Sequence, residues 1–467
     1  MICASISSDN ANDMLLRARA AAARGAEAVE LRIDSLASPT MDDIHLLSSA
    51  KVATIATFKG SSVELLRGDG LSEIFESFDL VDVEKADADG IHIPDKYRER
   101  LILSFHGEIG SVGDCTSVMS SMLSKGSIAK CINTGSGYGL SMIPCMAAGS
   151  MQSAMDRVIS FSTGDEGMLS RIWSMRNGAP VSYACLGEGE RTASGQLTIE
   201  EMLSARDGYV LGIVGSRAAT DHSLSPAIHS ALLSESGLSG VYLRFPAEKG
   251  ELGSFFEAAA TAGVNGFNVT MPFKEEALRL ADSADEISVE AGAVNTIVGS
   301  NGRFTGYNTD ALALSEIVSG LGPESALIFG SGGAGRAASY SLRGKSVSIA
   351  ARNEESGRKL ARQFGYDAFD GSGSRFDVLV NCTPIGMEEG SIPEYIRRCR
   401  FGAVIDFVYS NRETPFMRLA REQSAKYVGG IEILARQAVH SFGLWTGREV
   451  DPALAESVIG GAPEDAH

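Results

Sequence analysis

The sequence predicts an α/β protein in which a (β/α)8 barrel is followed by a two-lobed α/β region with a Rossmann-type nucleotide-binding lobe. The first observation is a series of short apolar runs, separated by helical stretches, through residues 1–200. The second is the glycine turn "GSGGAG" at 330–335, which lies between an apolar run and a helical one. The third is the length of 467 residues, which exceeds one ordinary core and predicts two or three domains.

Eight apolar runs in the first part of the chain are strand candidates. They are 2–6, 28–33, 52–57, 80–84, 101–106, 128–132, 157–162 and 181–185. Stretches of helical character separate most of them, as a (β/α)8 barrel requires, although 85–100 is a poor helix. We expect the barrel domain to occupy residues 1–207.

A second region is expected to begin after the helical "IEEMLSARDG", which stops at Gly208. Further on, "SALIFGSGGAGRAASYSL" has the pattern of a strand, a glycine turn and a helix. The runs "SVSIAARN", "DVLVNCTP" and "GAVIDFVY" are candidate strands of the same parallel sheet. We expect a substrate-binding lobe at 208–311, completed by 430–462, and a nucleotide-binding lobe at 312–429.

Composition and charge exclude several classes of function. The formal net charge of −18 gives no basic field for nucleic acid, although a small anionic ligand needs only a few local cations. No apolar run is long enough to span a bilayer, and the N-terminus has no recognisable secretory signal. The seven cysteines are scattered and lack C-x-x-C spacing, which predicts reduced thiols in the cytoplasm and no structural metal.

The glycine turn predicts a dinucleotide site. Its glycines permit a tight turn, and the helix N-terminus offers unpaired N–H groups to a pyrophosphate. The next strand ends in Ala351 and Arg352, where an NAD-binding domain usually has Asp or Glu. A guanidinium there suits a 2′-phosphate and favours NADP, while the nearby Glu354 and Glu355 leave NAD open.

Lys274 stands at an expected strand-to-helix junction in "FNVTMPFKEEA". A surface lysine at a helix start is the ordinary alternative. The loops "HSLSPAIH" (222–229), "GAVNTI" (292–297) and "GYNTDA" (306–311) supply hydroxyl, amide and carboxylate groups. Together with Lys274 they could line a pocket for a polyhydroxylated ring.

Two basic residues lie at the ends of expected barrel strands, His106 in "LILSFH" and Lys130 in "SIAKCI". The carboxyl ends of barrel strands face the active site. Burial is expected to lower the pKa of Lys130 and leave a nucleophilic amine for Schiff-base chemistry, with His106 moving protons. A snorkelling lysine and a hydrogen-bonded core histidine are the alternatives.

From about 209 to 460 the chain resembles shikimate dehydrogenases. Further motifs that carry the resemblance are "NCTPIGM" (381–387), "DFVYSNRETP" (406–415) and "GGIEILARQAVHSFGLWTG" (429–447). It implies that Lys274 and Asp310 form the catalytic pair, which polarises a ketone and delivers a proton. Substrate contacts are implied for Ser223, Ser225, Thr270, Asn295, Tyr409 and Gln437. Cofactor contacts are implied for Gly330, Gly332, Gly333, Ala334, Gly335, Arg352, Asn353, Asn381, Thr383, Met387 and Gly430.

Residues 1–205 resemble type I 3-dehydroquinate dehydratases. The motifs are "ELRID" (30–34), "DVE" (82–84), "SFH" (104–106), "IAKC" (128–131), "MLSRI" (168–172) and "ASGQLT" (193–198). The resemblance implies that Lys130 forms an imine with 3-dehydroquinate and that His106, oriented by Glu84, is the general acid and base. Substrate contacts are implied for Glu30, Arg32, Lys59, Glu84, Arg171, Thr192 and Gln196.

Three positions depart from the dehydratase pattern. Gly107 follows His106 where the family usually has Asp, and Lys59 stands where an arginine is expected. The serine expected before Gln196 is displaced, which leaves Thr192 and Ser194 as candidates.

The two resemblances fit together because the product of the first reaction is the substrate of the second. They imply a bifunctional shikimate-pathway enzyme that takes 3-dehydroquinate and 3-dehydroshikimate as small-molecule substrates and uses NADPH. A homodimer is left open as the assembly. Two alternatives also stay open: a quinate-directed dehydrogenase with a degenerate barrel, and a non-catalytic sensor of quinate-type ligands. The presence of both lysines counts against the sensor, and Ser223-Leu-Ser225 favours shikimate over quinate.

Overall fold

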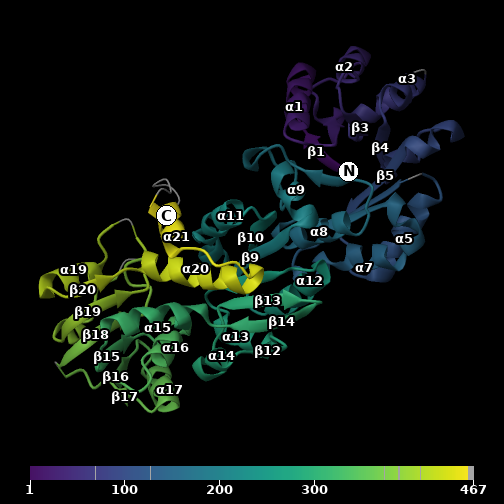
Figure 1. Cartoon of the computed structure of the whole chain (residues 1–467). Coiled ribbons are helices and arrows are strands. Elements are labelled where there is room, and N and C mark those ends of the chain that lie inside the picture. Colours follow the sequence, from purple (N-terminus) through teal and green to yellow (C-terminus); the bar gives the residue numbers. More distant parts are fainter. Residues whose placement is uncertain (69, 127, 373, 388–389, 411, 461–467) are drawn as a thin grey trace. The chain divides into compact units, whose positions relative to one another are not determined.

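The computed structural model describes residues 1–460 apart from 69, 127, 373, 388–389 and 411. Its contacts divide the chain into two units, whose elements are labelled in Figure 1. The first unit comprises Met1–Tyr209, Ser239–Val241 and Gly253–Gly263. The second comprises Val210–Leu238, Tyr242–Leu252 and the chain from Val264 onward.

The first unit is built on an eight-stranded parallel sheet in the order β7-β6-β5-β4-β3-β2-β1-β8, which curves into a nearly closed barrel. Its strands are β1 Ile2–Ile6, β2 Ala28–Arg32, β3 Ala53–Phe58, β4 Leu80–Glu84, β5 Leu101–Gly107, β6 Ile128–Asn133, β7 Val158–Ser162 and β8 Ser182–Ala184. Each lies within one residue of its predicted bounds, so the barrel prediction is confirmed. Among the described residues, no ladder joins β7 to β8.

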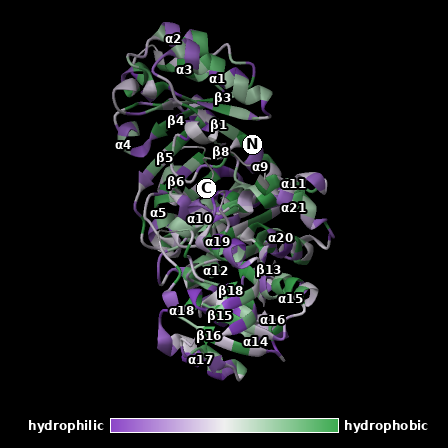
Figure 2. Ribbon diagram, turned by 90° about the vertical axis from the view of Figure 1, so that its left-hand side faces the viewer, coloured by the Kyte–Doolittle hydropathy of each residue, from purple (hydrophilic) through white to green (hydrophobic). Residues whose placement is uncertain are grey.

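Helices follow most of these strands along the chain. They are α1 Ala11–Ala23, α2 Met41–Leu47, α3 Gly70–Ser77, α4 Lys85–Ala88, α5 Val112–Leu123, α6 Tyr138–Ser141, α7 Ile143–Ser150, α8 Met168–Arg176 and α9 Ile199–Asp207. The poor helix expected after β4 is only the four-residue α4, followed by a 3-10 turn at Asp95–Arg100. Hydrophobic residues, green in Figure 2, are frequent in the strands.

Strand periodicity places Lys130 inside the barrel. Ile128 and Ile132, two positions to either side, belong to the buried cluster that also contains Ile55, Ile102 and Ile159 from other strands. Because side chains two residues apart share a face of a strand, Lys130 lies on the same inner face. The apolar run predicted from sequence therefore carries a charged side chain into the core.

The second unit contains a mixed six-stranded sheet in the order β10-β9-β11-β13-β14-β12. Its strands are β9 Tyr209–Gly215, β10 Gly240–Pro246, β11 Gly266–Val269, β12 Ser283–Ala284, β13 Thr296–Ser300 and β14 Arg303–Tyr307. Antiparallel β13 and β14 are joined by Asn301 and Gly302, whose positive φ values of 52° and 73° suit a type I′ hairpin turn. Helices of this region are α10 Arg217–Asp221, α11 Ser225–Glu235, α13 Lys274–Leu280 and α14 Glu286–Ala291, whereas α12 Leu252–Ala262 belongs from Gly253 onward to the first unit.

The other sheet of this unit is parallel, in the order β17-β16-β15-β18-β19-β20. Its strands are β15 Ser325–Phe329, β16 Ser346–Ala350, β17 Asp367–Ala368, β18 Arg375–Asn381, β19 Arg400–Asp406 and β20 Lys426–Val428. This is the 3-2-1-4-5-6 order of a Rossmann fold, whose ligand crevice lies where the order reverses, here between β15 and β18. The predicted nucleotide-binding fold is thus confirmed.

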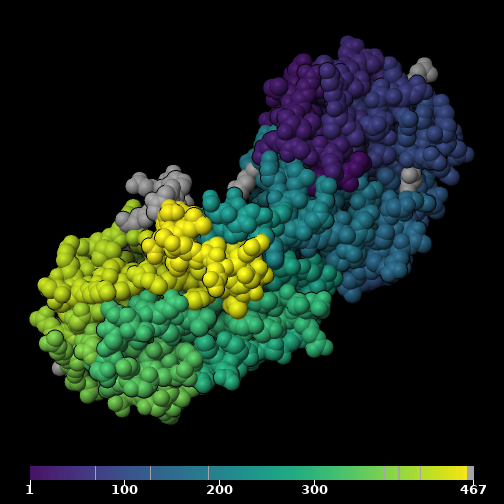
Figure 3. All heavy atoms as spheres, in the orientation of Figure 1, coloured from purple at the N-terminus to yellow at the C-terminus, as the bar shows by residue number. Residues whose placement is uncertain are grey.

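Helices connect and cover these strands. They are α15 Thr309–Leu321, α16 Gly333–Ser341, α17 Glu354–Phe364, α18 Glu394–Arg397, α19 Pro415–Gln423, α20 Gly430–Thr446 and α21 Pro452–Gly460. The long α20 packs against α15 and α21, and it lies on the surface in Figure 3, coloured yellow. It thereby brings C-terminal residues back to the sheet of β9–β14, where Trp445 Nε1 donates a 2.8 Å hydrogen bond to the carbonyl of Ile297.

We predict that Gly266→Ala destabilises the second unit by about 1–3 kcal/mol, the usual cost of overpacking a core. A Cβ at this position would lie 2.2 Å from Trp445 Nε1 and 2.7 Å from the carbonyl oxygen of Ile297. Urea denaturation of the full chain measures the effect. The matched control is Gly320→Ala in α15, where a Cβ would meet no described residue within 4 Å beyond its own turn of helix. Helix propensity predicts unchanged or higher stability there, and equal stability of the two variants would contradict the prediction.

Candidate active sites

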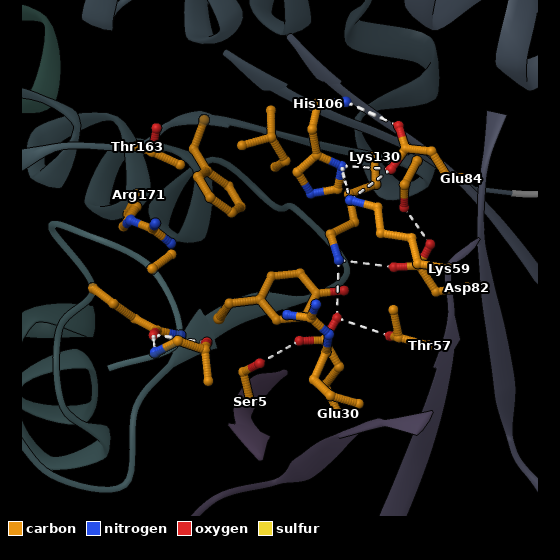
Figure 4. Close-up of a pocket in the computed structure, with 18 of the residues that line it drawn as sticks. Ser5, Glu30, Thr57, Lys59, Asp82, Glu84, His106, Lys130, Thr163 and Arg171 are labelled. Atoms are coloured by element: carbon orange, nitrogen blue, oxygen red, sulfur yellow. Dashed lines mark hydrogen bonds and ion pairs between the residues drawn. The ribbon is translucent and has the colours of Figure 1, made fainter. Parts of the chain in front are cut away.

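A pocket lies at the carboxyl ends of the barrel strands (Figure 4). All the catalytic and substrate-contact residues predicted for the first half line it: Glu30, Arg32, Lys59, Glu84, His106, Lys130, Arg171, Thr192 and Gln196. Thr192 is among the lining residues, whereas the alternative Ser194 is not. Sequence reasoning did not single out Ser5, Thr57, Asp82, Ser104 and Tyr183, which also line it.

Lys130 is held at the bottom of this pocket by two carboxylates. Its Nζ lies 2.8 Å from Asp82 Oδ2 and 3.0 Å from Glu30 Oε1, and Figure 4 shows the amine between them. The three side chains are at most 6% exposed. Asp82 also accepts a hydrogen bond from the Ser104 hydroxyl, and Glu30 accepts one of 2.9 Å from Thr57. These hydroxyls fix the carboxylates against the amine.

The charge state of this cluster differs from the sequence expectation. Burial by itself would lower the pKa of Lys130, but the charges of Asp82 and Glu30 outweigh it, and the pKa lies well above its ordinary value. The expectation of a lowered lysine pKa is therefore wrong, because it ignored the two partners. Burial would likewise raise the pKa of Glu30, yet Lys130 and Arg32 lower it to about 2. The resting pocket holds an ammonium and ionised Glu30.

His106 is oriented by Glu84 at the rim of the pocket. Its Nδ1 lies 2.8 Å from Glu84 Oε2, and its backbone N–H donates a 3.1 Å hydrogen bond to Oε1. Because Nδ1 is engaged, Nε2 is the ring nitrogen left for proton transfer. Lys59 Nζ joins this group, 3.0 Å from Glu84 Oε2 and 3.4 Å from His106 Nδ1. Burial raises the pKa of Glu84, but His106 and Lys59 together lower it overall.

The departure at Gly107 has a local steric reason. A Cβ there would lie 2.7 Å from the ring of Phe105. An aspartate at this position would therefore require the Phe105 ring to move.

Arg171 is a buried cation with spare donors. It is 3% exposed, its guanidinium stacks 4.2 Å from the ring centroid of Phe161, and Nε and Nη2 have no partner among the described residues. Burial lowers its pKa to about 10, which still leaves it charged at neutral pH. In Figure 4 it lies across the pocket from Asp82 and Glu84. A desolvated cation with unused donors suits a carboxylate ligand.

Arg32 and Gln196 are already hydrogen-bonded within the protein. Asp34 accepts hydrogen bonds of 2.8 and 2.7 Å from Arg32 Nε and Nη2. The Gln196 side-chain oxygen accepts from the N–H and hydroxyl of Thr192, at 3.0 and 3.1 Å. Their orientation is therefore set before any ligand binds.

The second unit brings its predicted catalytic pair together. Lys274 is the first residue of α13 and Asp310 the second residue of α15, and Lys274 Nζ donates a 2.6 Å hydrogen bond to Asp310 Oδ2. Asn308 caps α15 by accepting from the Ala311 N–H, which fixes the first turn that carries Asp310. The two side chains are 19% and 10% exposed, so the ammonium can reach a bound ligand.

Hydrogen bonds join only some of the substrate-contact residues predicted for the second unit. Asn295 Nδ2 donates a 3.3 Å hydrogen bond to Gln437 Oε1, and the Ser225 N–H donates a 3.2 Å hydrogen bond to Ser223 Oγ. Thr270 follows β11, and Tyr409 is half-buried in the segment after β19, where burial raises its phenol pKa. No described hydrogen bond joins the hydroxyl of Thr270 or Tyr409 to the other predicted substrate-contact residues.

The sequence did not reveal a buried network of hydroxyl and amide groups in this unit. Asn268 Nδ2 donates to Ser441 Oγ at 3.0 Å and to Thr296 Oγ1 at 3.2 Å, while Asn268 Oδ1 accepts a 2.6 Å hydrogen bond from Tyr242. Thr309, beside Asp310, joins Ser441 at 3.1 Å. Asn268 lies in the quoted motif "FNVT", but nothing in that motif distinguishes a buried network residue from a ligand.

The glycine turn offers an uncapped helix end. Gly332 precedes α16 without a side-chain cap, and a Cβ built on it would meet no described residue within 4 Å apart from its chain neighbours. Gly330 has φ +124°, and a Cβ on Gly335 would meet the carbonyl oxygen of Gly330 at 2.2 Å. A Cβ on Gly333 would meet Lys274 Cδ at 2.6 Å. Open space at Gly332 beside unpaired N–H groups fits a pyrophosphate.

The other predicted cofactor residues surround the carboxyl edge of the Rossmann sheet. Arg352 is exposed after β16, and Asn353 caps α17 by accepting from the Ser356 N–H at 3.0 Å. Asn381 is buried and donates a 2.8 Å hydrogen bond to Asp406, while its oxygen accepts from Thr383. Met387 is 49% exposed. A Cβ on Gly430 would lie 2.6 Å from the Val408 backbone.

All seven cysteines are free thiols, as predicted, and six are buried. Within the described part of the chain, no group of three or more His, Cys, Asp or Glu is arranged to hold a metal ion. No described helix is both long and apolar enough to cross a membrane.

Comparison with known proteins matches both halves. The sequence model of type I 3-dehydroquinase matches residues 2–208, and that of the shikimate dehydrogenase substrate-binding domain matches 213–297. An NADP(+) shikimate dehydrogenase of an Exiguobacterium species is 36% identical over 264 residues, which cover 55% of this chain and 99% of the relative. A chloroplastic bifunctional 3-dehydroquinate dehydratase/shikimate dehydrogenase of Arabidopsis thaliana is 29% identical over 510 residues, covering 96% of this chain and 82% of the relative.

A solved structure gives the same match for the second half. The shikimate 5-dehydrogenase of Thermus thermophilus, in complex with NADP(H) and shikimate, aligns with a TM-score of 0.50 at 34% identity. The alignment covers 54% of this chain and 98% of that one.

We predict that His229 makes stability fall in acid. It is fully buried, stacks on Tyr242 at 4.5 Å, and burial lowers its pKa from 6.5 to about 3. Between these two pKa values His229 binds a proton in the unfolded chain but not in the folded chain. The free energy of unfolding therefore falls as pH falls below about 6.5, by up to ~1.4 kcal/mol per pH unit.

His229→Phe keeps an aromatic ring at this position and should reduce this slope between pH 6.5 and 5, as followed by urea denaturation, since carboxylates such as Glu30 contribute only at lower pH. The exposed His92 supplies the control, because His92→Phe should keep the slope. Equal slopes in wild type and His229→Phe would show that His229 is not the group involved.

Proposed function

The chain belongs to the shikimate dehydrogenase family and carries a type I 3-dehydroquinase domain before it, and we propose that it catalyses two consecutive steps of the shikimate pathway. The barrel dehydrates 3-dehydroquinate to 3-dehydroshikimate, and the second unit reduces this product to shikimate with NADPH. The observation that supports this most is the presence of two lysines in suitable surroundings. Lys130 shares its pocket with His106, and Lys274 lies beside Asp310. Their presence also disfavours a non-catalytic sensor.

In the dehydratase, Arg171 holds the substrate carboxylate with its spare donors, helped by Gln196. Lys130 starts as an ammonium and passes one proton to a neighbouring carboxylate, Asp82 or Glu30. Its lone pair then forms a C–N bond to the ketone carbon, and the ketone oxygen leaves as water. An ammonium and a ketone give an iminium and water, so the step needs no net proton.

His106 then moves the proton that elimination requires. It removes a proton from the carbon next to the iminium, and the electron pair forms an enamine. The enamine expels the hydroxyl group at the following carbon, which takes the proton back from His106 and leaves as water. Glu84 holds His106 in place, with Lys59 beside it. Hydrolysis of the product imine restores the Lys130 amine.

In the dehydrogenase, bound NADPH would supply a hydride to the ketone carbon of 3-dehydroshikimate. Lys274 donates a hydrogen bond to the ketone oxygen and gives it a proton as negative charge develops there, while Asp310 holds the ammonium. We propose that the carboxylate contacts Ser223, Ser225 and Tyr409. The ring hydroxyls are assigned to Thr270, Asn295, Asp310 and Gln437.

The residues that would hold NADPH carry groups that suit its phosphates and its nicotinamide. The turn of Gly330, Gly332, Gly333, Ala334 and Gly335 would offer N–H groups to the pyrophosphate, with open space at Gly332. Arg352, with Asn353 beside it, would bind the 2′-phosphate. The proposed nicotinamide contacts are Asn381, Thr383, Met387 and Gly430.

We further propose that residues 1–207 form the dehydratase domain, 208–311 with 430–462 the substrate-binding lobe, and 312–429 the NADP-binding lobe. Residues 461 and 462 lie outside the described part of the chain. The free thiols fit a reducing compartment such as the cytoplasm. A homodimer is the assembly we propose to test by light scattering.

We predict that 3-dehydroquinate and NADPH are sufficient for shikimate formation. Lys130→Ala should lower NADPH oxidation from 3-dehydroquinate by about 10³-fold or more and leave the rate from 3-dehydroshikimate unchanged. Lys274→Ala should abolish NADPH oxidation from either substrate yet still produce the ultraviolet absorbance of 3-dehydroshikimate. A quinate-directed dehydrogenase with a degenerate barrel would instead oxidise quinate in preference to shikimate, and would leave 3-dehydroquinate unchanged in the Lys274→Ala variant.

We predict that Arg352→Ala raises the KM for NADPH roughly 10- to 100-fold, because charge-assisted hydrogen bonds to a phosphate are lost. The KM for NADH should change little. The matched control is Arg358→Ala in α17, whose side chain is exposed and paired with Glu354 at 2.8 Å. If Arg352→Ala weakens both cofactors equally, this residue does not select NADP.

A further inference from the structure

The phenol of Tyr183 in β8 is buried in the dehydratase pocket. The residue is 4% exposed, and its hydroxyl has no hydrogen-bond partner among the described residues. Two other buried phenols have hydrogen-bond partners: Tyr97 donates to Glu76 at 3.1 Å and Tyr242 to Asn268 at 2.6 Å. A buried hydroxyl without a partner lowers stability, and phenylalanine would fill the same space without that cost. The hydroxyl is therefore more consistent with a contact to a ligand than with packing.

The position of Tyr183 relative to Lys130 identifies the part of the ligand it meets. Lys130 Nζ lies 4.2 Å from the centroid of the Tyr183 ring. The groups that hydrogen-bond Nζ in the protein, Asp82 and Glu30, are acceptors. A ketone carbon attacked by Nζ carries its oxygen two bonds from Nζ, in the part of the pocket that Tyr183 also lines. Asp82 and Glu30, while ionised, repel negative charge that develops on this oxygen.

The phenol can act only as a donor to that oxygen while it keeps its proton. Burial, together with Glu30 and Asp82, raises the pKa of Tyr183 well above its ordinary value, although Lys130 opposes this. The hydroxyl consequently stays protonated next to the ionised cluster.

We infer that Tyr183 is a further substrate-contacting residue of the dehydratase, whose hydroxyl donates a hydrogen bond to the ketone oxygen that Lys130 attacks. The inference rests on the proposed imine at Lys130. As the C–N bond forms, the π electrons of the carbonyl move to the oxygen, and the Tyr183 O–H stabilises the charge there. The oxygen gains its protons from the cluster and leaves as water, while Tyr183 ends the step unchanged.

The test is Tyr183→Phe in the full chain, which removes one oxygen atom and keeps the ring. We expect kcat of the dehydratase to fall roughly 5- to 20-fold, with a smaller change in KM, because the hydrogen bond strengthens as the carbonyl is attacked. Borohydride trapping of the Lys130 adduct should slow by the same factor in single-turnover experiments. The melting temperature should be unchanged or higher, since the variant loses an unpaired buried hydroxyl.

Two controls separate a specific effect from a structural one. The dehydrogenase activity of the same protein reports its integrity and should be unaffected. Tyr97→Phe makes the same chemical change at a phenol with a partner outside the pocket, and should lower stability while leaving dehydratase kcat unchanged. Wild-type kcat and trapping in Tyr183→Phe, or a change confined to KM, would overturn the inference. If wild type itself gives no Lys130 adduct, the imine mechanism fails, and the role of Tyr183 fails with it.

Discussion

A lysine can lie in the core of this barrel only because two carboxylates lie against it. An isolated ammonium at such a depth would lose its proton or destabilise the fold by several kcal/mol. Asp82 and Glu30 reverse that outcome, and their own burial is supported by hydroxyls of Ser104 and Thr57 on neighbouring strands. The pocket is thus a set of charges and donors that compensate one another. Removing either carboxylate leaves the buried ammonium with one partner instead of two.

This constraint shapes the chemistry as well as the fold. A resting amine would be a ready nucleophile, but it would leave two ionised carboxylates buried close to each other. The ammonium avoids that repulsion, and the proton needed to turn the ketone oxygen into water is already present. Arg171 is the opposite case: its Nε and Nη2 have no partner among the described residues, so its desolvation is left for the ligand to compensate. Binding of an anionic substrate therefore completes the electrostatics of the pocket.

The sequence predicted the elements better than the interactions between them. Strand bounds followed from apolar runs, because burial on both faces of a parallel strand leaves a continuous hydrophobic signal. Lys130 and His106 stood out as basic residues at strand ends. Asp82 lies in the motif "DVE" without a predicted role, because the contact with Lys130 spans β5, which separates β4 from β6 in the folded sheet. The wrong sign for the lysine pKa has the same origin, because local sequence reveals burial but not a partner 48 residues away.

The second unit shows how closely a binding motif and a catalytic residue can constrain each other. A glycine turn in a sequence predicts space for a phosphate, and Gly332 fits that prediction. Gly333 does not, because its missing side chain is replaced by the stem of Lys274, whose Cδ would lie 2.6 Å from a Cβ. Arg336, directly after the turn, donates a 2.9 Å hydrogen bond to Glu275, the residue following Lys274. The start of α16 is therefore packed against the start of α13. A side chain at Gly333 would displace the ammonium from Asp310 before it disturbed any contact with a nucleotide.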